Sequence, residues 1–180
     1  MGLLMLLVLL FPVLSFGSEW DKQFIEATKV KAEQGFDNAQ YWLGGMYKEG
    51  EGVPKDDKEA VKWFRLAADQ GNANAQFNLA LMYANGRGVP KDDKEAVKWF
   101  RLAADRGHAK AQFNLGVMYA NGKGVPKNNL LAYMWTNIAG ANGYDVEENM
   151  GIISGKMSQA DIAKAEEKTT QYIKDHPDVY

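Results

Sequence analysis

Apolar side chains recur at helical spacing in the middle of the chain. They follow the pattern i, i+3, i+4, i+7 and i+8 and are separated by charged residues, as an amphipathic helix requires; the positions are Ala60, Trp63, Phe64, Ala67 and Ala68. This pattern predicts a helix over residues 57–70. Asp56 and Glu59 have the spacing of a capping box at its start, and Gly71 stands where a left-handed residue would end it.

The next apolar segment, residues 73–84, is predicted to be a second helix. Its apolar side chains form two stripes, with Ala75, Leu79, Met82 and Tyr83 on one and Phe77, Leu81 and Ala84 on the other. A helix that is apolar on two sides is packed between neighbours or presents one side to a ligand. Asn85-Gly86 ends it, and Gly88-Val89-Pro90 predicts an extended turn, because a residue before proline avoids the helical region.

This helix pair is written twice. Residues 56–91 return as residues 92–127 with six changes, at positions 70, 72, 74, 80, 81 and 87 of the first copy. Repetition at a period of 36 residues indicates units that bury their apolar faces by stacking on one another. The predicted fold class is therefore all-α, an α/α superhelical solenoid of antiparallel helix pairs.

The pattern A-x-x-W-F-x-x-A-A-x-x-G, followed by A-Q-x-N-L-G-x-M-Y-x-x-G-x-G-V-P-K, resembles the Sel1-like repeat, a relative of the tetratricopeptide repeat. Residues 35–55 match its second half and residues 128–143 its first half, so the repeats extend over 35–143 with complete copies at 56–91 and 92–127. The resemblance implies a scaffold or adaptor that binds other proteins, in bacteria often an exported one.

The N-terminal residues 1–17 have the character of a signal peptide. No charged side chain precedes Glu19, and the apolar run is shorter than the roughly 20 residues that span a bilayer. Small residues favour cleavage between Gly17 and Ser18. The predicted location is periplasmic or secreted; the alternative is an inner-membrane protein that keeps this segment as an uncleaved anchor.

Both ends of the repeat array depart from the pattern. Residues 18–34 are expected to form an N-terminal capping helix, in which Ala27 and Thr28 replace the tryptophan and phenylalanine of later copies. Residues 144–180 are expected to form a C-terminal helical cap with a last helix over about 159–174. A solenoid needs such ends, because its terminal units face water on one side.

Composition and motifs exclude several function classes. The chain has a net charge of −2 and no cysteine, which argues against nucleic acid as a partner and against a disulfide framework. The three loops GEGVPK, GRGVPK and GKGVPK lack the rest of a phosphate-binding loop, so we interpret them as turns. Paired aspartates at 56–57 and 92–93 fit helix starts. With two histidines and no nucleophile motif, we expect no catalytic residues, no metal and no cofactor.

The remaining apolar stripe of the second helices is the candidate site. In tetratricopeptide-like stacking these helices line the concave surface, where aromatic rings and amides suit a peptide. The expected protein-binding residues are Asn38, Tyr41, Lys48, Asn74, Phe77, Leu81, Asn85, Lys110, Phe113, Val117 and Asn121. An alternative is that Tyr41, Phe77 and Phe113 are core positions.

The expected function is thus a non-catalytic protein–protein adaptor of the bacterial cell envelope, or a secreted one, that binds a protein or peptide segment on its concave face. Two alternatives stay open. One is a hydrolase or ligand-binding protein that acts on cell-wall material, which would need a pocket of converging polar groups. The other is a membrane-anchored regulator.

Overall fold

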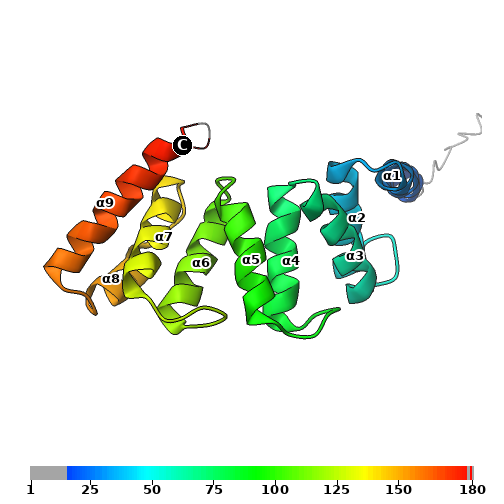
Figure 1. Cartoon of the computed structure of the whole chain (residues 1–180). Coiled ribbons are helices and arrows are strands. Elements are labelled where there is room, and N and C mark those ends of the chain that lie inside the picture. Colours follow the sequence, from blue (N-terminus) through cyan, green and yellow to red (C-terminus); the bar gives the residue numbers. More distant parts are fainter. Residues whose placement is uncertain (1–15, 178, 180) are drawn as a thin grey trace, which may run out of the picture.

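Helices follow one another in a single row along the molecule (Figure 1). The structure, a computed structural model, describes residues 16–177 and 179, and in this part of the chain every regular element is an α-helix. The helices are α1 Phe16–Glu33, α2 Asp37–Glu49, α3 Asp57–Asp69, α4 Ala73–Asn85, α5 Asp93–Ala104, α6 Ala109–Asn121, α7 Asn129–Ala141, α8 Glu147–Ser154 and α9 Gln159–Asp175.

The row is a stack of helix pairs in which successive helices from α1 to α8 pack on one another, while α9 packs on α7. The pairs α3–α4 and α5–α6 are the two complete copies, and α2, α4 and α6 each pack against the first helix of the next copy. The predicted all-α repeat fold is confirmed. The predicted helices 57–70 and 73–84 correspond to α3 and α4 within one residue at each end.

Aspartate caps begin the first helix of each copy. The Asp56 side chain accepts hydrogen bonds from the backbone N–H groups of Lys58 and Glu59, at 2.8 and 3.1 Å, and Asp92 repeats this in α5. The full capping box was a wrong prediction. The backbone N–H of Asp56, which Glu59 would accept from, donates instead to the carbonyl of Tyr47, because the incoming chain packs against the end of α2.

The glycine-rich loops are held by packing on the first helix of their own copy. Gly88 has a φ of +68°, and a Cβ there would lie 2.1 Å from the carbonyl oxygen of Asp57. Gly124 meets Asp93 in the same way, one copy further on. These close approaches to backbone explain the second glycine of each loop.

Tryptophans join one copy to the next. Trp99 and Trp135 are buried, whereas Trp63 is half-buried. The Arg65 guanidinium lies 5.9 Å from the Trp99 ring centre, and its side chain also donates to the Tyr83 hydroxyl. Arg101 repeats the arrangement, 5.1 Å from Trp135 and hydrogen-bonded to Tyr119. Each arginine therefore connects its own copy to the tryptophan of the following one.

The two ends differ from the copies between them. At the N-terminal end, α1 is seen almost end-on in Figure 1, at a steep angle to the other helices. At the C-terminal end α9 packs on α7, where the Tyr172 ring meets Trp135 edge-on at 5.0 Å and its hydroxyl donates to Asp105 at 2.8 Å. The short helix α8, which the sequence pattern did not reveal, connects these two helices.

Candidate protein-binding groove

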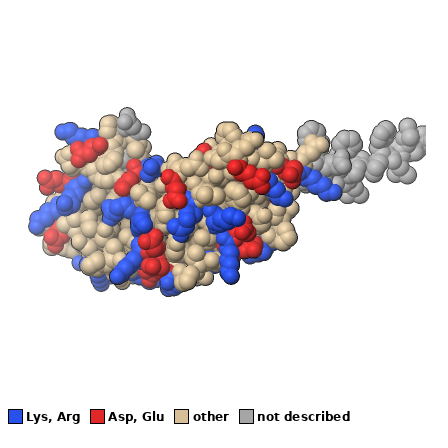
Figure 2. Space-filling view, turned by 45° about the vertical axis from the view of Figure 1, so that its right-hand side comes forward, with Lys and Arg blue, Asp and Glu red and all other residues tan. Residues whose placement is uncertain are grey.

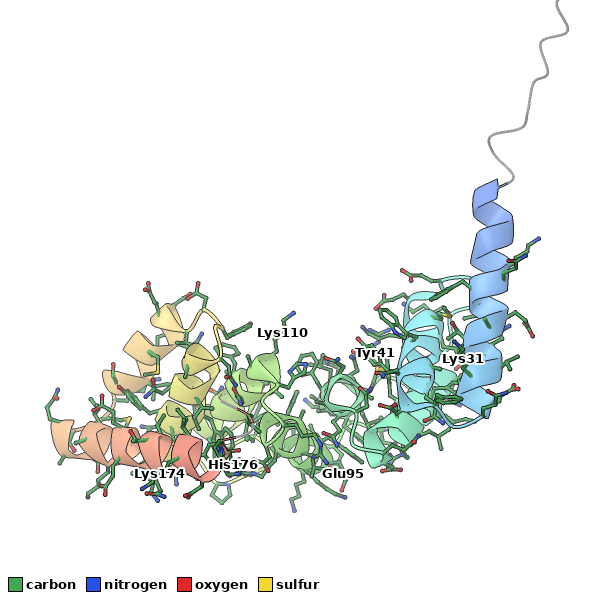
Figure 3. All side chains as sticks on the ribbon, turned by 90° about the horizontal axis from the view of Figure 1, so that it is seen from above. Lys31, Tyr41, Glu95, Lys110, Lys174 and His176 are labelled. Carbon is green, nitrogen blue, oxygen red and sulfur yellow. The ribbon has the colours of Figure 1, made fainter. Side chains whose placement is uncertain are left out.

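Helices α2, α4 and α6 line the inner side of a curved molecule. Figure 3 views the row from above, with Tyr41 and Lys110 on the side toward which the ends bend, and Glu95 and Lys174 on the opposite side. Tyr41 belongs to α2 and Lys110 to α6. The expected concave surface is therefore a surface of the second helices, and we call it the groove.

The groove contains an open cavity of about 480 Å³, here named the central hollow. Four of the expected residues line it together: Tyr41, Asn74, Phe77 and Lys110. The other lining residues were not predicted from the sequence; they are chiefly Asn78, His108, Asn142 and Tyr144. These come from the neighbouring position of α4 and from the turns before α6 and after α7, so three successive copies build one site.

The groove aromatics belong both to the surface and to the core. Phe77 is half-buried: its ring stacks on His108 at 4.5 Å and lies 5.9 Å from Phe100 of the next copy. Tyr41 lies 6.1 Å from Phe64 in the corresponding place. Tyr41 and Phe77 therefore serve both as core and as groove residues. Each ring packs on the next copy, and each residue also lines the hollow.

A second cavity of about 310 Å³, the N-terminal hollow, adjoins the central one and shares Tyr41 and Asn78 with it. It contains the expected Lys48, whose ammonium pairs with Glu49 at 2.8 Å. Its most prominent side chain is Trp42, 57% exposed, with Phe24 beside it. Trp42 was missed because the complete copies carry asparagine at its position, Asn78 and Asn114.

A third, smaller cavity of about 150 Å³ lies toward α8 and includes the expected Val117 and Asn121. The side-chain amide of Asn121 donates to the Val117 carbonyl at 2.9 Å, and Asn85 donates to the Leu81 carbonyl in the same way. Each bond uses one of the two amide N–H groups, and the side-chain oxygen can accept from a ligand.

Four expected residues lie outside these three hollows. They are Asn38, whose side chain accepts from the Asn72 amide at 3.1 Å; Leu81, which packs on the core; the exposed Asn85; and Phe113, whose ring lies 4.8 Å from Tyr144. The structure thus brings seven of the eleven expected residues into hollows. Whether any of the eleven binds a partner stays a prediction.

The His108 side chain forms part of the wall of the central hollow. Its Nδ1 accepts from the backbone N–H of Ala111 at 3.2 Å and so caps α6, as Asn72 caps α4. Burial lowers the pKa of His108, and the nearby charge of Lys110 lowers it further. Both effects favour the neutral ring, which this cap requires.

Charges are sparse in the groove and dense on the outer helices. Helix α4 has no charged residue, and the only one in α6 is Lys110. The outer helices α3 and α5 instead carry ion pairs such as Lys62–Glu59 at 3.1 Å and Lys98–Glu95 at 3.5 Å. On the face seen in Figure 2, positive and negative side chains are interspersed.

Neither a cluster of metal-binding side chains nor a membrane-spanning helix is found in the described part of the chain. No three His, Cys, Asp or Glu side chains there lie close enough together to hold a metal ion. Among the described helices, none has the length and apolar character needed to cross a membrane.

A row of antiparallel helix pairs whose second helices line a groove defines a solenoid of the tetratricopeptide-like class. The chain belongs to the Sel1 repeat family: three Sel1 repeats match residues 37–72, 73–108 and 109–144. Each matched unit joins a groove helix to the following outer helix. Repeats of this family generally serve as scaffolds for protein–protein interactions.

Two solved structures are similar to this chain. A Sel1 repeat protein from Oxalobacter formigenes is 37% identical, with a TM-score of 0.66, over 72% of this chain and 98% of that one. The protein c5321, a protective antigen of uropathogenic Escherichia coli strains, is 31% identical with a TM-score of 0.66. That match covers 86% of this chain but 42% of c5321. No curated protein matches the chain.

Proposed function

We propose that this protein is a non-catalytic adaptor that holds an extended segment of another protein along its groove. The observation that carries the proposal is a pair of adjoining hollows lined by aromatic rings, with Trp42 more than half exposed in one and Phe77 half-buried in the other. Exposed aromatic side chains in a concave surface are the typical anchors of protein interfaces.

The repeat spacing suits an extended polypeptide. Packed helices lie about 10 Å apart, and three residues of an extended chain cover about that distance. A segment crossing the groove would therefore present about one side chain per copy. The asparagine oxygens of α4 and α6 are available to its backbone N–H groups.

The groove can be tested with a variant that leaves the core intact. Trp42→Ala removes an exposed ring, so the melting temperature should change little, whereas binding to the partner should weaken by about 2 kcal/mol, as for an aromatic anchor. The partner is first captured from the native cell envelope with the wild-type protein and identified by mass spectrometry. Its affinity for each variant is then measured by calorimetry.

Lys62→Ala is the matched control, because Lys62 is exposed on the outer helix α3. It should retain wild-type affinity. A partner that binds the Trp42 variant normally and the Lys62 variant weakly would place the binding surface on the outer helices and overturn the proposal.

We also propose that the protein is exported to the periplasm or secreted, with its N-terminal segment removed. The support is the uncharged, apolar sequence before Glu19, most of which lies outside the described residues. N-terminal sequencing of the protein isolated from its native cells should start at or near Ser18. Recovery of an intact Met1 species from the membrane fraction would favour the anchored regulator instead.

A further inference from the structure

The two complete copies differ at six positions, and two of these differences fall in the central hollow. Asn72 and Asn74 of the first copy become His108 and Lys110 of the second. Both new side chains line the same cavity, where Asn74 also lies. Copies that are otherwise almost identical therefore differ by placing two basic residues at one point of the groove.

The basic side chains share one space. Lys110 is exposed, and burial of the His108 ring, with a smaller effect of the Lys110 charge, lowers the pKa of His108 and favours its neutral form. The Ala111 N–H donates to Nδ1 of His108, so the proton of the neutral ring is on Nε2. The hollow thus offers an ammonium group and a ring N–H, both of which are donors.

No acidic side chain is among the residues that line the central hollow in the described structure. Lys110 forms no ion pair with a described residue either, in contrast to Lys48 at the N-terminal hollow, which is paired with Glu49. Asn142, which also lines the hollow, already donates its amide to the Gly107 carbonyl and to Gln112. The hollow has a positive charge that nothing in the described chain neutralises.

We propose that the central hollow binds the carboxylate of an aspartate or glutamate side chain in the partner's segment. Lys110 donates a charge-assisted hydrogen bond to one carboxylate oxygen, and Nε2–H of His108 donates to the other. This assignment rests on the proposed function, because it names a side chain of the segment that occupies the groove.

A side chain fits this position better than a chain terminus. The central hollow opens into the N-terminal hollow through Tyr41 and Asn78, and the groove continues along α6 toward Val117 and Asn121. A segment that follows the groove would therefore pass the hollow on both sides. The segment that binds best should have an acidic residue at its centre and an apolar residue that contacts the Trp42 ring.

Peptide selection tests this preference without knowledge of the partner. The probe is a library of random peptides of about 12 residues, which reach roughly 40 Å when extended. The peptides are displayed on phage and selected on the full chain without its first 17 residues, once with free and once with blocked C-termini. We expect wild-type selections to be enriched in aspartate or glutamate at one central position, whether or not the terminus is blocked.

The chain supplies its own control variants. Lys110→Asn and His108→Asn each place in the second copy the residue that the first copy uses, and asparagine can also cap a helix, as Asn72 does. Both variants should fold with melting temperatures near that of the wild type. Lys110→Asn should bind a selected peptide about tenfold more weakly, which corresponds to the loss of one charge-assisted hydrogen bond.

Replacing the acidic residue of that peptide by its amide should weaken wild-type binding by a similar factor and have little further effect on Lys110→Asn. The two losses then belong to one interaction. Peptides selected without acidic enrichment, or equal losses in both proteins, would overturn the carboxylate site and leave the adaptor proposal standing. Enrichment only with free C-termini would assign the hollow to a terminal carboxylate. If no peptide is selected at all, both proposals fail.

Discussion

His108 combines three roles in one side chain. Its Nδ1 caps α6, its ring stacks on Phe77 of the preceding copy, and its exposed edge lines the central hollow. Protonation would replace the accepting nitrogen of the cap by a donor that faces the Ala111 N–H. The ring therefore connects the stability of α6 to pH.

The sign of this effect follows from the pKa. Burial and Lys110 lower the pKa of His108 in the folded state, so the unfolded chain binds the proton more readily. The stabilisation is fully present above the ordinary value of about 6.5 and is lost as pH falls from there through the lower, folded pKa. Melting temperatures measured between about pH 7.5 and about pH 5 should fall more steeply for the wild type than for His108→Asn.

His108→Asn is the appropriate reference because asparagine can also cap the helix. His176 is present in both the wild type and this variant, so its contribution to the pH dependence is common to the two proteins. The difference between the two melting curves should be constant at the upper end of the range. Parallel curves throughout would show that the ring titrates alike in the folded and unfolded chain.

Single residues also show where the sequence was insufficient. Phe77 could be assigned to the groove because it recurs in phase with Tyr41 and Phe113, whereas Trp42 breaks the repeat and left no periodic signal. The change from Asn72 to His108 was visible as a difference between copies. The stacking of His108 on Phe77 could not be predicted, because it joins residues of different copies and depends on how the copies are arranged in space.

Neighbouring helices are joined by contacts that repeat from copy to copy. Trp99 on α5 packs against Arg65 of α3 and is buried, so Trp99→Ala leaves a cavity between two copies and should cost roughly 3 to 5 kcal/mol of unfolding free energy. Chemical denaturation followed by circular dichroism would measure this loss. Lys98→Ala, on the exposed side of the same helix, should cost less than about 1 kcal/mol. Similar losses for the two variants would contradict the role of Trp99 as a joint between copies.

The helices that belong to the repeated copies could be predicted from the sequence. Two matching copies fixed the phase of the apolar stripes, and the predicted bounds of α3 and α4 agree with the structure to within one residue. Helix α8 has eight residues, a single buried side chain at Ile153 and the exposed Ile152 beside it. Such a short segment gives too few turns for a periodic pattern to be recognised.

For the molecule as a whole, the stacking of pairs was predictable but the shape of its surface was not. The groove residues were chosen from one helix stripe, and seven of them line hollows in the structure. The walls that close those hollows come from the turns around His108 and Tyr144 and from the capping helix with Phe24. These segments meet only after several copies have stacked, so the sequence of a single copy does not predict which residues line the hollows.

The close fit of the Gly88 and Gly124 loops on the first helix of their own copies has a consequence for how such a chain can change over generations. Gly88 meets Asp57 and Gly124 meets Asp93 through the same backbone contact inside each complete copy, and the arginine–tryptophan contacts between copies also recur every 36 residues. A duplicated or deleted stretch of 36 codons would therefore preserve both kinds of contact. The gene can therefore lengthen or shorten the groove by whole units in one recombination event, without a compensating mutation where two copies meet.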